Sequence, residues 1–341
     1  MFDHLIGNQA VKDAIGRFIS NRRIPNSLLF AGPEGVGKKQ FALQLARSIV
    51  CHEPQNGGAC GECLACRRVN EFKFPGADAK GDDYDFVFFS EHPDVGMVVP
   101  FNRTLRVGSI RALETEANFR PYEAGARIFI IDEAHKMNAA SSNALLKTLE
   151  EPPSTSHIFL ITSKPNALLP TIRSRVQTLR FGPIAASELE HHLLATHEYS
   201  QSDARLVAST SNGSVAHALS VNAEEFRSRR NEAIEILRSA IVNHDLVDIL
   251  KRSEKFGGIK ATPEFEAFLG VLQTMIHDIW LVRTGSTAVL ADDEVTRLAE
   301  FADPKALASW LEHIEEIRAA LGVNINKKIA ADSLLIRMAT A

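Results

Sequence analysis

Residues 32–39 read Gly-Pro-Glu-Gly-Val-Gly-Lys-Lys. The pattern G-x-x-x-x-G-K-[ST] wraps backbone N–H groups around nucleotide phosphates and places a hydroxyl on Mg²⁺. Gly32, Gly37 and Lys38 match this pattern, and Gly35 lies inside the loop, but Lys39 stands where Ser or Thr is expected. An ammonium group has no lone pair to offer a metal. The stretch therefore predicts a site for the phosphates of ATP or ADP and argues against Mg²⁺ there.

The flanking residues predict a strand before this loop and a helix after it. Residues 27–31 are apolar, and residues 38–50 repeat apolar side chains at helical spacing. Further apolar runs at 85–89, 127–132, 157–162 and 178–181 alternate with helical patterns. This alternation predicts an α/β fold, with a parallel sheet of about five strands and helices on its faces.

The pattern changes after Phe181. Residues 187–190 form a capping-box sequence that opens a helix, and the rest of the chain reads as helices with short polar breaks. A chain of 341 residues is too long to fold around a single hydrophobic core, so more than one domain is expected. We therefore predict a nucleotide-binding-like domain at 1–181, a helical lid at 182–243 and an all-α C-terminal domain at 244–341.

Composition narrows the class of protein. Hydrophobic residues make up 45% of the chain and charged residues 23%, which is typical of a globular protein. A net charge of −4 argues against a large, uniformly basic nucleic-acid surface. The most apolar stretch, 265–282, contains Glu266, His277 and Asp278, so we expect a buried helix rather than a membrane span. The N-terminus lacks the pattern of a signal peptide, and we expect a cytoplasmic protein without membrane contact.

All four cysteines lie in one short window, at Cys51, Cys60, Cys63 and Cys66. Four thiolates at this spacing can surround one tetrahedral ion, and such a closed site is structural rather than catalytic. Free thiols or a disulfide pair are the plainer alternative, and an iron–sulfur cluster also uses four cysteines. We expect a zinc module near residues 51–66.

The run 128–135 has the layout of a Walker B strand, an apolar strand that ends in an acidic pair. In such sites the first carboxylate, here Asp132, organises Mg²⁺ and the second, here Glu133, polarises the attacking water. A capped turn between a strand and a helix would leave the same pattern. Thr162 ends the next strand at a position from which a polar group could reach the γ-phosphate, although a hydrogen-bonded strand end explains it equally well.

Several longer segments carry a resemblance to a known family. They are residues 92–94 (HPD), 119–122 (FRPY), 132–137 (DEAHKM), 144–153 (ALLKTLEEPP) and 171–175 (TIRSR). The last resembles the Ser-Arg-Cys motif of AAA+ clamp-loader subunits, with Val176 in place of the cysteine. Together the segments, between Asp3 and Phe181, are similar to the delta-prime family of bacterial DNA polymerase III clamp-loader subunits.

The resemblance implies an AAA+ module with an inserted zinc module, a helical lid and a C-terminal collar. It implies assembly with gamma/tau and delta subunits in a hetero-pentameric ring, which loads the sliding clamp on primed DNA as part of the DNA polymerase III holoenzyme. In this family the subunit is a stator, and Arg175 corresponds to the arginine finger that acts on a neighbour's ATP. A guanidinium suits that role. A surface salt bridge is the alternative for Arg175.

The resemblance also implies that the subunit's own site is weak. Ala216 falls where AAA+ lids carry an arginine that contacts the γ-phosphate, and a methyl group cannot do so. A helix start that packs on the lid is the alternative, and we prefer it for this segment. Because Lys39 and Ala216 both depart from an active site, we expect Asp132 and Glu133 to be weak or vestigial and the isolated chain to have no ATPase activity.

Two other functions compete with the stator. One is an active gamma/tau-like ATPase motor, which Lys38, Asp132 and Glu133 favour. The other is a stand-alone zinc-containing nucleic-acid-binding protein. The basic pairs Arg22-Arg23 and Arg67-Arg68 favour it, because they could contact DNA phosphates. The net negative charge of the chain argues against a nucleic-acid-binding protein.

Overall fold

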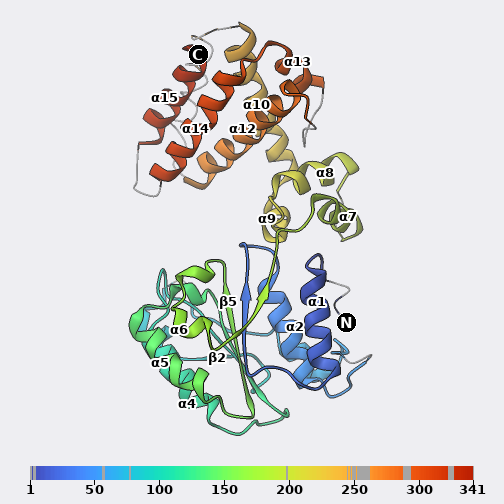
Figure 1. The fold of residues 1–341 in the computed structure, drawn as a ribbon, viewed down its shortest axis with the longest axis vertical. Coiled ribbons are helices and arrows are strands. Elements are labelled where there is room, and N and C mark those ends of the chain that lie inside the picture. Colours follow the sequence, from blue (N-terminus) through green and yellow to red (C-terminus); the bar gives the residue numbers. More distant parts are fainter. Residues whose placement is uncertain are drawn as a thin grey trace. The chain divides into compact units, whose positions relative to one another are not determined.

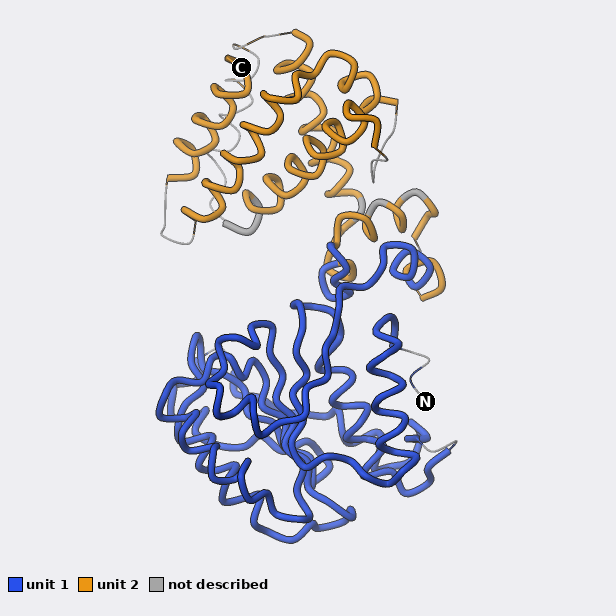
Figure 2. Tube along the Cα trace, viewed as in Figure 1, with its two compact units in different colours: residues 1–192, 212–217 blue, residues 193–211, 218–341 orange. Residues whose placement is uncertain are grey.

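The computed structural model describes residues 2, 5–55, 58–76, 78–196, 199–243, 245, 247, 251, 262–286, 293–321 and 326–340. The chain forms two compact units, shown separately coloured in Figure 2. Unit 1 comprises residues 1–192 and 212–217, and unit 2 comprises residues 193–211 and 218–341. The three-domain division at 181 and 243 stays a prediction, and residue 244 lies outside the described residues.

Unit 1 is built around a six-stranded sheet with the order β2-β3-β4-β5-β1-β6. All neighbouring strands pair in parallel except β2, which is antiparallel to β3 at one edge. The strands are β1 (Ser27–Ala31), β2 (Phe88–Phe89), β3 (Val95–Val98), β4 (Arg127–Ile131), β5 (Ser156–Thr162) and β6 (Gln177–Arg180).

The central strands are buried on both faces, so consecutive residues enter different cores. In β1, Leu28 and Phe30 join one apolar cluster, whereas Leu29 and Ala31 join the other. The first cluster is covered by α1 (Gln9–Ser20) and α2 (Lys38–Val50), and the second by α4 (Val107–Ala117), α5 (Ala139–Glu150) and α6 (Pro170–Arg173) (Figure 1). This arrangement explains the nearly continuous apolar runs of the strands.

The predicted α/β fold with a parallel sheet is confirmed, but one strand was misplaced. Residues 85–89 form only the short β2, which pairs antiparallel with β3. The fifth parallel strand is β3, which the sequence analysis missed. It has four residues, and Gly96 interrupts its apolar pattern. A Cβ at Gly96 would meet Val87 Cγ1 at 2.5 Å, so close packing requires glycine there.

A buried carboxylate fixes the turn before β4. Asp94 is fully buried and accepts the N–H groups of Tyr122, Glu123 and Ala124 at 2.7, 2.8 and 2.8 Å. The equally buried Arg127 places Nε 3.9 Å from Asp94 Oδ1 and donates from Nη2 to Glu116 at 2.9 Å. The carboxylate thereby joins the 119–124 segment to the start of the strand that ends at Asp132.

Short elements complete unit 1. The helix α3 (Leu64–Arg68) follows the cysteine loop, and α7 (Ala186–Thr196) begins beside the predicted capping box. The described loops of unit 1 also contain the 3₁₀ helices η1 (Gly81–Tyr84), η2 (Ala134–Lys136) and η3 (Pro165–Ala167).

The described part of unit 2 is helical, as predicted for the chain beyond Phe181. Its elements are α8 (Gln201–Thr210), α9 (Val215–Ser220), α10 (Ala223–Arg238), the π-helix η4 (Ser239–Asn243), α12 (Thr262–Arg283), α13 (Asp293–Phe301), α14 (Pro304–Leu321) and α15 (Lys327–Thr340). The helices α10 and α12–α15 share one apolar core. The division between the units falls inside α7 and α9.

One described helix, Phe265–Arg283, is long and apolar enough to cross a membrane by length and composition. Half of that window is buried, and Phe265, Leu269, Leu272 and Ile276 lie in the core of unit 2. The core helix of a globular protein meets the same criteria, which agrees with the predicted buried helix.

We expect Asp94→Asn to destabilise unit 1 strongly. The amide keeps the shape of the carboxylate but removes the fully buried charge beside Arg127, which keeps the partly exposed Glu116 as a partner, and it turns an N–H group toward N–H donors. Loss of one member of a buried charge pair costs about 3–5 kcal/mol. The free energy of unfolding can be measured by urea denaturation followed by far-UV circular dichroism. The control is Asp82→Asn, because Asp82 also pairs with an arginine but its side chain is 92% exposed. Equal unfolding midpoints for the two variants would contradict the role of Asp94.

Candidate functional site

The sheet order brings the candidate nucleotide residues to one edge. Strands β4, β5 and β1 are adjacent and parallel, so their carboxyl ends lie side by side. The loop at 32–37 follows β1, Asp132 follows β4, and Thr162 is the last residue of β5 and is paired with Ala31. Carboxyl ends of parallel strands are where open α/β sheets bind ligands.

The phosphate loop needs its glycines. Gly37 precedes α2 with φ 93°, and Gly35 has φ 74°, both in the left-handed region that other residues avoid. A Cβ at Gly35 would lie 1.9 Å from Ser214 Oγ. The loop therefore has the backbone form that its sequence predicts, followed by the free N–H groups that begin a helix.

A segment distant in sequence covers this loop within unit 1. The Ala216 N–H donates to the Gly35 carbonyl at 3.1 Å, and Ser214 packs against the same glycine. Ala216 thus lies beside the loop. The methyl group supplies no charge there.

The two lysines of the loop have different partners. Lys38 is 7% exposed, and its Nζ donates to the carbonyls of Gly32 (2.8 Å) and Pro33. Burial lowers the pKa of Lys38, although Glu34 and Asp132 nearby act in the opposite direction. Lys39 instead points at the Walker B strand, and its Nζ lies 3.0 Å from Asp132 Oδ2.

The remaining candidate groups also have partners inside the chain. Glu133 has φ 47°, and its carboxylate pairs with Lys136 Nζ at 2.8 Å. A hydrogen bond of 3.2 Å joins Thr162 Oγ1 and His135 Nδ1, and the Lys164 N–H donates to the same hydroxyl at 3.0 Å. Burial lowers the pKa of His135 and so favours its neutral form. Sequence analysis did not identify Lys136 or His135 as partners, although the three-residue spacing of Glu133 and Lys136 was a usable signal.

Arg175 lies between α6 and β6, with about a third of its side chain exposed. Its Nη2 pairs with Glu150 Oε1 at 2.6 Å, and its Nη1 donates to the Thr171 carbonyl at 2.9 Å and to Ser174 Oγ at 3.3 Å. Glu150 ends α5 and was not singled out from the sequence. The guanidinium is therefore held at the surface by one carboxylate and two neutral acceptors.

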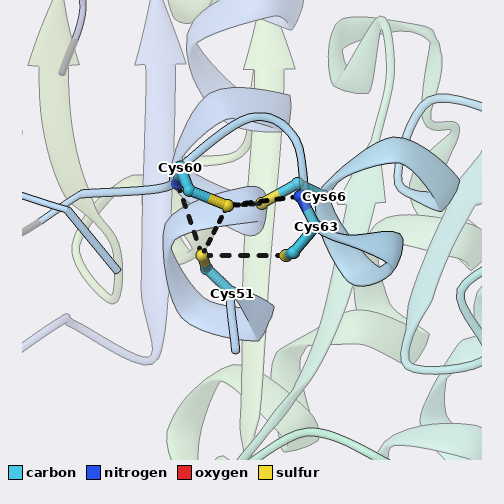
Figure 3. Close-up of side chains that lie close together, drawn as sticks. All are labelled: Cys51, Cys60, Cys63 and Cys66. Atoms are coloured by element: carbon cyan, nitrogen blue, oxygen red, sulfur yellow. Dashed lines mark hydrogen bonds between the residues drawn. The ribbon is translucent and has the colours of Figure 1, made fainter. Parts of the chain in front are cut away.

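The four cysteines point their sulfur atoms toward one another (Figure 3). Cys51 directly follows α2, Cys60 lies in the loop, and Cys63 and Cys66 belong to the start and middle of α3. The Sγ atoms of Cys51 and Cys60 are 3.6 Å apart, and those of Cys51–Cys63 and Cys60–Cys66 are 3.9 Å apart.

This geometry fits one metal ion. A tetrahedron of sulfurs at the usual Zn–S length of about 2.3 Å has edges of about 3.8 Å, whereas a disulfide requires about 2.0 Å. The Cys60 and Cys63 N–H groups donate to Cys51 Sγ (3.4 Å) and Cys60 Sγ (3.3 Å), which stabilises thiolates. Burial raises the pKa of the Cys66 thiol. The four cysteines could hold a metal such as zinc.

Arg68 anchors this cysteine module to the body of unit 1. Its guanidinium makes a two-pronged pair with the carboxylate of Glu123, 3.1 Å from Nη1 to Oε1. The Glu123 N–H in turn donates to the buried Asp94. The module is thereby joined to the start of β4 through charged hydrogen bonds.

Comparison with known proteins identifies relatives. Residues 7–185 match the family model described as "DNA polymerase III, delta subunit". The DNA polymerase III subunit delta' of Bacillus subtilis (strain 168) is 34% identical over 64% of this chain and 60% of its own length. The subunit delta' of Pseudomonas aeruginosa is 27% identical over 92% of both chains. The subunit tau/gamma of Haemophilus influenzae is 24% identical over 98% of this chain but only 49% of its own length.

We expect protein purified without a chelator to carry one metal ion per chain at the cysteines. Inductively coupled plasma mass spectrometry measures the metal content. Cys66→Ser should lose most of the metal, because the hydroxyl that replaces the buried thiol is a poor ligand for a soft site. His52→Ala is the control, since His52 adjoins Cys51 but is exposed and is not one of the four ligands. Metal-free wild-type protein, or equal loss in both variants, would contradict the site.

Proposed function

This chain belongs to the family described as DNA polymerase III, delta subunit, and from that premise we propose that it is a delta-prime-like stator of the replicative clamp loader. In this role it assembles with gamma/tau and delta subunits in a hetero-pentameric ring in the cytoplasm. The ring loads the sliding clamp on primed DNA. The chain supplies an arginine finger to a neighbour's ATP site and has no ATPase activity of its own.

The observation that carries the proposal is the ion pair between Lys39 and Asp132. In phosphate-loop ATPases the Ser or Thr after the lysine and the Walker B aspartate hold Mg²⁺ between them. Here an ammonium replaces the hydroxyl and lies 3.0 Å from the aspartate. Glu133, the residue type that polarises water, is paired with Lys136. Both groups needed for hydrolysis are engaged by cations of the chain itself.

The position of Arg175 supports a role outside its own site. Among the described residues its polar partners are Glu150, Thr171 and Ser174, and none of them belongs to the phosphate loop. The ion pair with Glu150 is partly exposed, so solvent screens it. A phosphate of a nucleotide bound to the neighbouring subunit could therefore replace Glu150 as the partner of Arg175 at modest cost in free energy. A planar guanidinium binds phosphate oxygens well.

A gamma/tau-like motor is the second candidate. Lys38, Asp132 and Glu133 favour it, and the tau/gamma relative matches most of this chain. The ion pairs of Asp132 with Lys39 and of Glu133 with Lys136 weigh against a motor. The nucleic-acid-binding alternative loses part of its support, because Arg68 is engaged by Glu123.

The remaining assignments belong to the same proposal. The cysteines hold zinc, because their sulfur spacing fits a single ion and a multi-iron cluster would hold them farther apart. Residues 1–181 form the AAA+ module, residues 182–243 the lid and residues 244–341 the collar that assembles the ring. The loop residues Gly32, Gly35, Gly37, Lys38 and Lys39, with Thr162, form a binding site for ADP or ATP without turnover.

We expect the isolated full-length chain to show no Mg²⁺-dependent ATP hydrolysis above background. The reason is that Lys39 and Lys136 neutralise the two carboxylates that hydrolysis requires. A coupled assay for phosphate release measures turnover, with a gamma/tau subunit as the positive control. Robust turnover by the pure chain would favour the motor instead.

We expect Arg175→Ala to lower the ATPase activity of the reconstituted complex about 10³-fold at the neighbouring site, the lower range for an arginine finger. Assembly with gamma/tau and delta subunits, followed by size-exclusion chromatography, should be unchanged. Arg173→Ala is the matched control, because Arg173 is an exposed arginine two positions away that contacts Asn166. Equal activity of the Arg175→Ala and wild-type complexes, measured for that one site with the other sites inactivated, would refute the finger.

A further inference from the structure

Lys39 is held in place from two sides. Its ammonium pairs with Asp132 and lies 5.8 Å from the centre of the Phe74 ring. Phe74 is itself fixed, because it stacks on Phe72 with ring centres 5.7 Å apart and meets Phe88 edge-on at 5.5 Å. Cation–π contacts of this kind add to the attraction of the carboxylate. The Lys39 side chain is 41% exposed, and its ammonium has partners on two sides.

Lys39 occupies one of the two positions that would hold a metal, and its ammonium faces the other, Asp132. Phosphate-loop proteins bind Mg²⁺ between the residue at the position of Lys39 and the Walker B aspartate. Asp132 Oδ2 faces Lys39, and Asp132 Oδ1 accepts the Glu133 N–H at 3.0 Å, so both carboxylate oxygens have a partner. Mg²⁺ binds oxygens at about 2.0–2.1 Å in a strict octahedron and would have to displace the ammonium. Repulsion between the two cations opposes that displacement.

The Lys39 ammonium can also bind the phosphates of a nucleotide directly. Lys38 and Lys39 are consecutive residues at the start of α2, where free N–H groups and the helix dipole also attract anions. Within the described part of the chain, Lys38 donates to loop carbonyls, which a phosphate oxygen can replace. Two ammonium groups then supply the positive charge that a lysine and Mg²⁺ supply elsewhere.

We propose that the Lys39 ammonium is a built-in substitute for the divalent cation, so that this site binds a nucleoside di- or triphosphate without Mg²⁺. The inference rests on the nucleotide-binding part of the proposed function and is independent of the finger and of ring assembly. It accounts for a phosphate loop that keeps its glycines and its lysine but lacks the metal-binding hydroxyl.

The test is isothermal titration calorimetry of the full-length chain with ADP, in Mg²⁺ and in EDTA. Wild-type affinity should agree within about threefold between the two conditions. Lys39→Thr removes the charge and restores the hydroxyl, so its affinity in EDTA should fall about tenfold or more and recover on adding Mg²⁺. Lys39→Met offers neither group and should bind weakly in both conditions.

Lys73→Thr is the matched control, because Lys73 adjoins Phe74 but is exposed and pairs only weakly with Glu91, at 3.8 Å. It should behave as wild type. Unchanged circular dichroism and metal content show that each variant is folded. Wild-type binding that requires Mg²⁺, or undiminished affinity of Lys39→Thr in EDTA, overturns the inference. Absence of ADP binding to the wild type in both conditions also overturns it, while normal ring assembly and the Arg175 effect would leave the stator role standing.

Discussion

The candidate site depends on the burial of three adjacent parallel strands on both faces. Because β1, β4 and β5 send alternate side chains into two packed cores, a one-residue shift of register would move each side chain into the opposite core and disrupt the packing of both. Parallel pairing then brings the ends of all three strands to one edge of the sheet. The loop at 32–37, Asp132 and Thr162 meet there although they are far apart in the chain. The cysteine module joins the same framework through Arg68, Glu123 and Asp94.

At that edge the groups associated with ATP hydrolysis are satisfied by the chain itself. Lys39 pairs with Asp132, Lys136 with Glu133, and His135 with Thr162. Half-buried charges of one sign at the end of a sheet would repel one another, and the lysines remove that repulsion without a metal. Arg175 also has a carboxylate partner, Glu150, which is half exposed. An interaction of this kind is weak enough to be exchanged for a stronger one with a phosphate.

Local patterns predicted much of the fold and part of the site. The strands at 27–31, 127–131 and 156–162 are mostly apolar and buried, and the α/β class followed from them. The strand β3 was missed, because four residues that include Gly96 carry too little periodicity to stand out. The role of Asp94 in holding the 119–124 segment was also invisible. A single aspartate before a strand looks the same whether it accepts three buried N–H groups or faces water.

The sequence by itself determined the phosphate loop and the cysteine cluster, because in both the chemistry depends on neighbours within a few residues. Glycines allow the loop its backbone form, and close cysteine spacing lets four sulfurs converge. It also showed that position 39 lacks a metal-binding hydroxyl. Only the tertiary structure decided what the lysine there does. Asp132 lies 93 positions away along the chain, and strand pairing in the sheet brings its carboxylate to 3.0 Å from the ammonium. Contacts of that separation follow from packing, which no local pattern records.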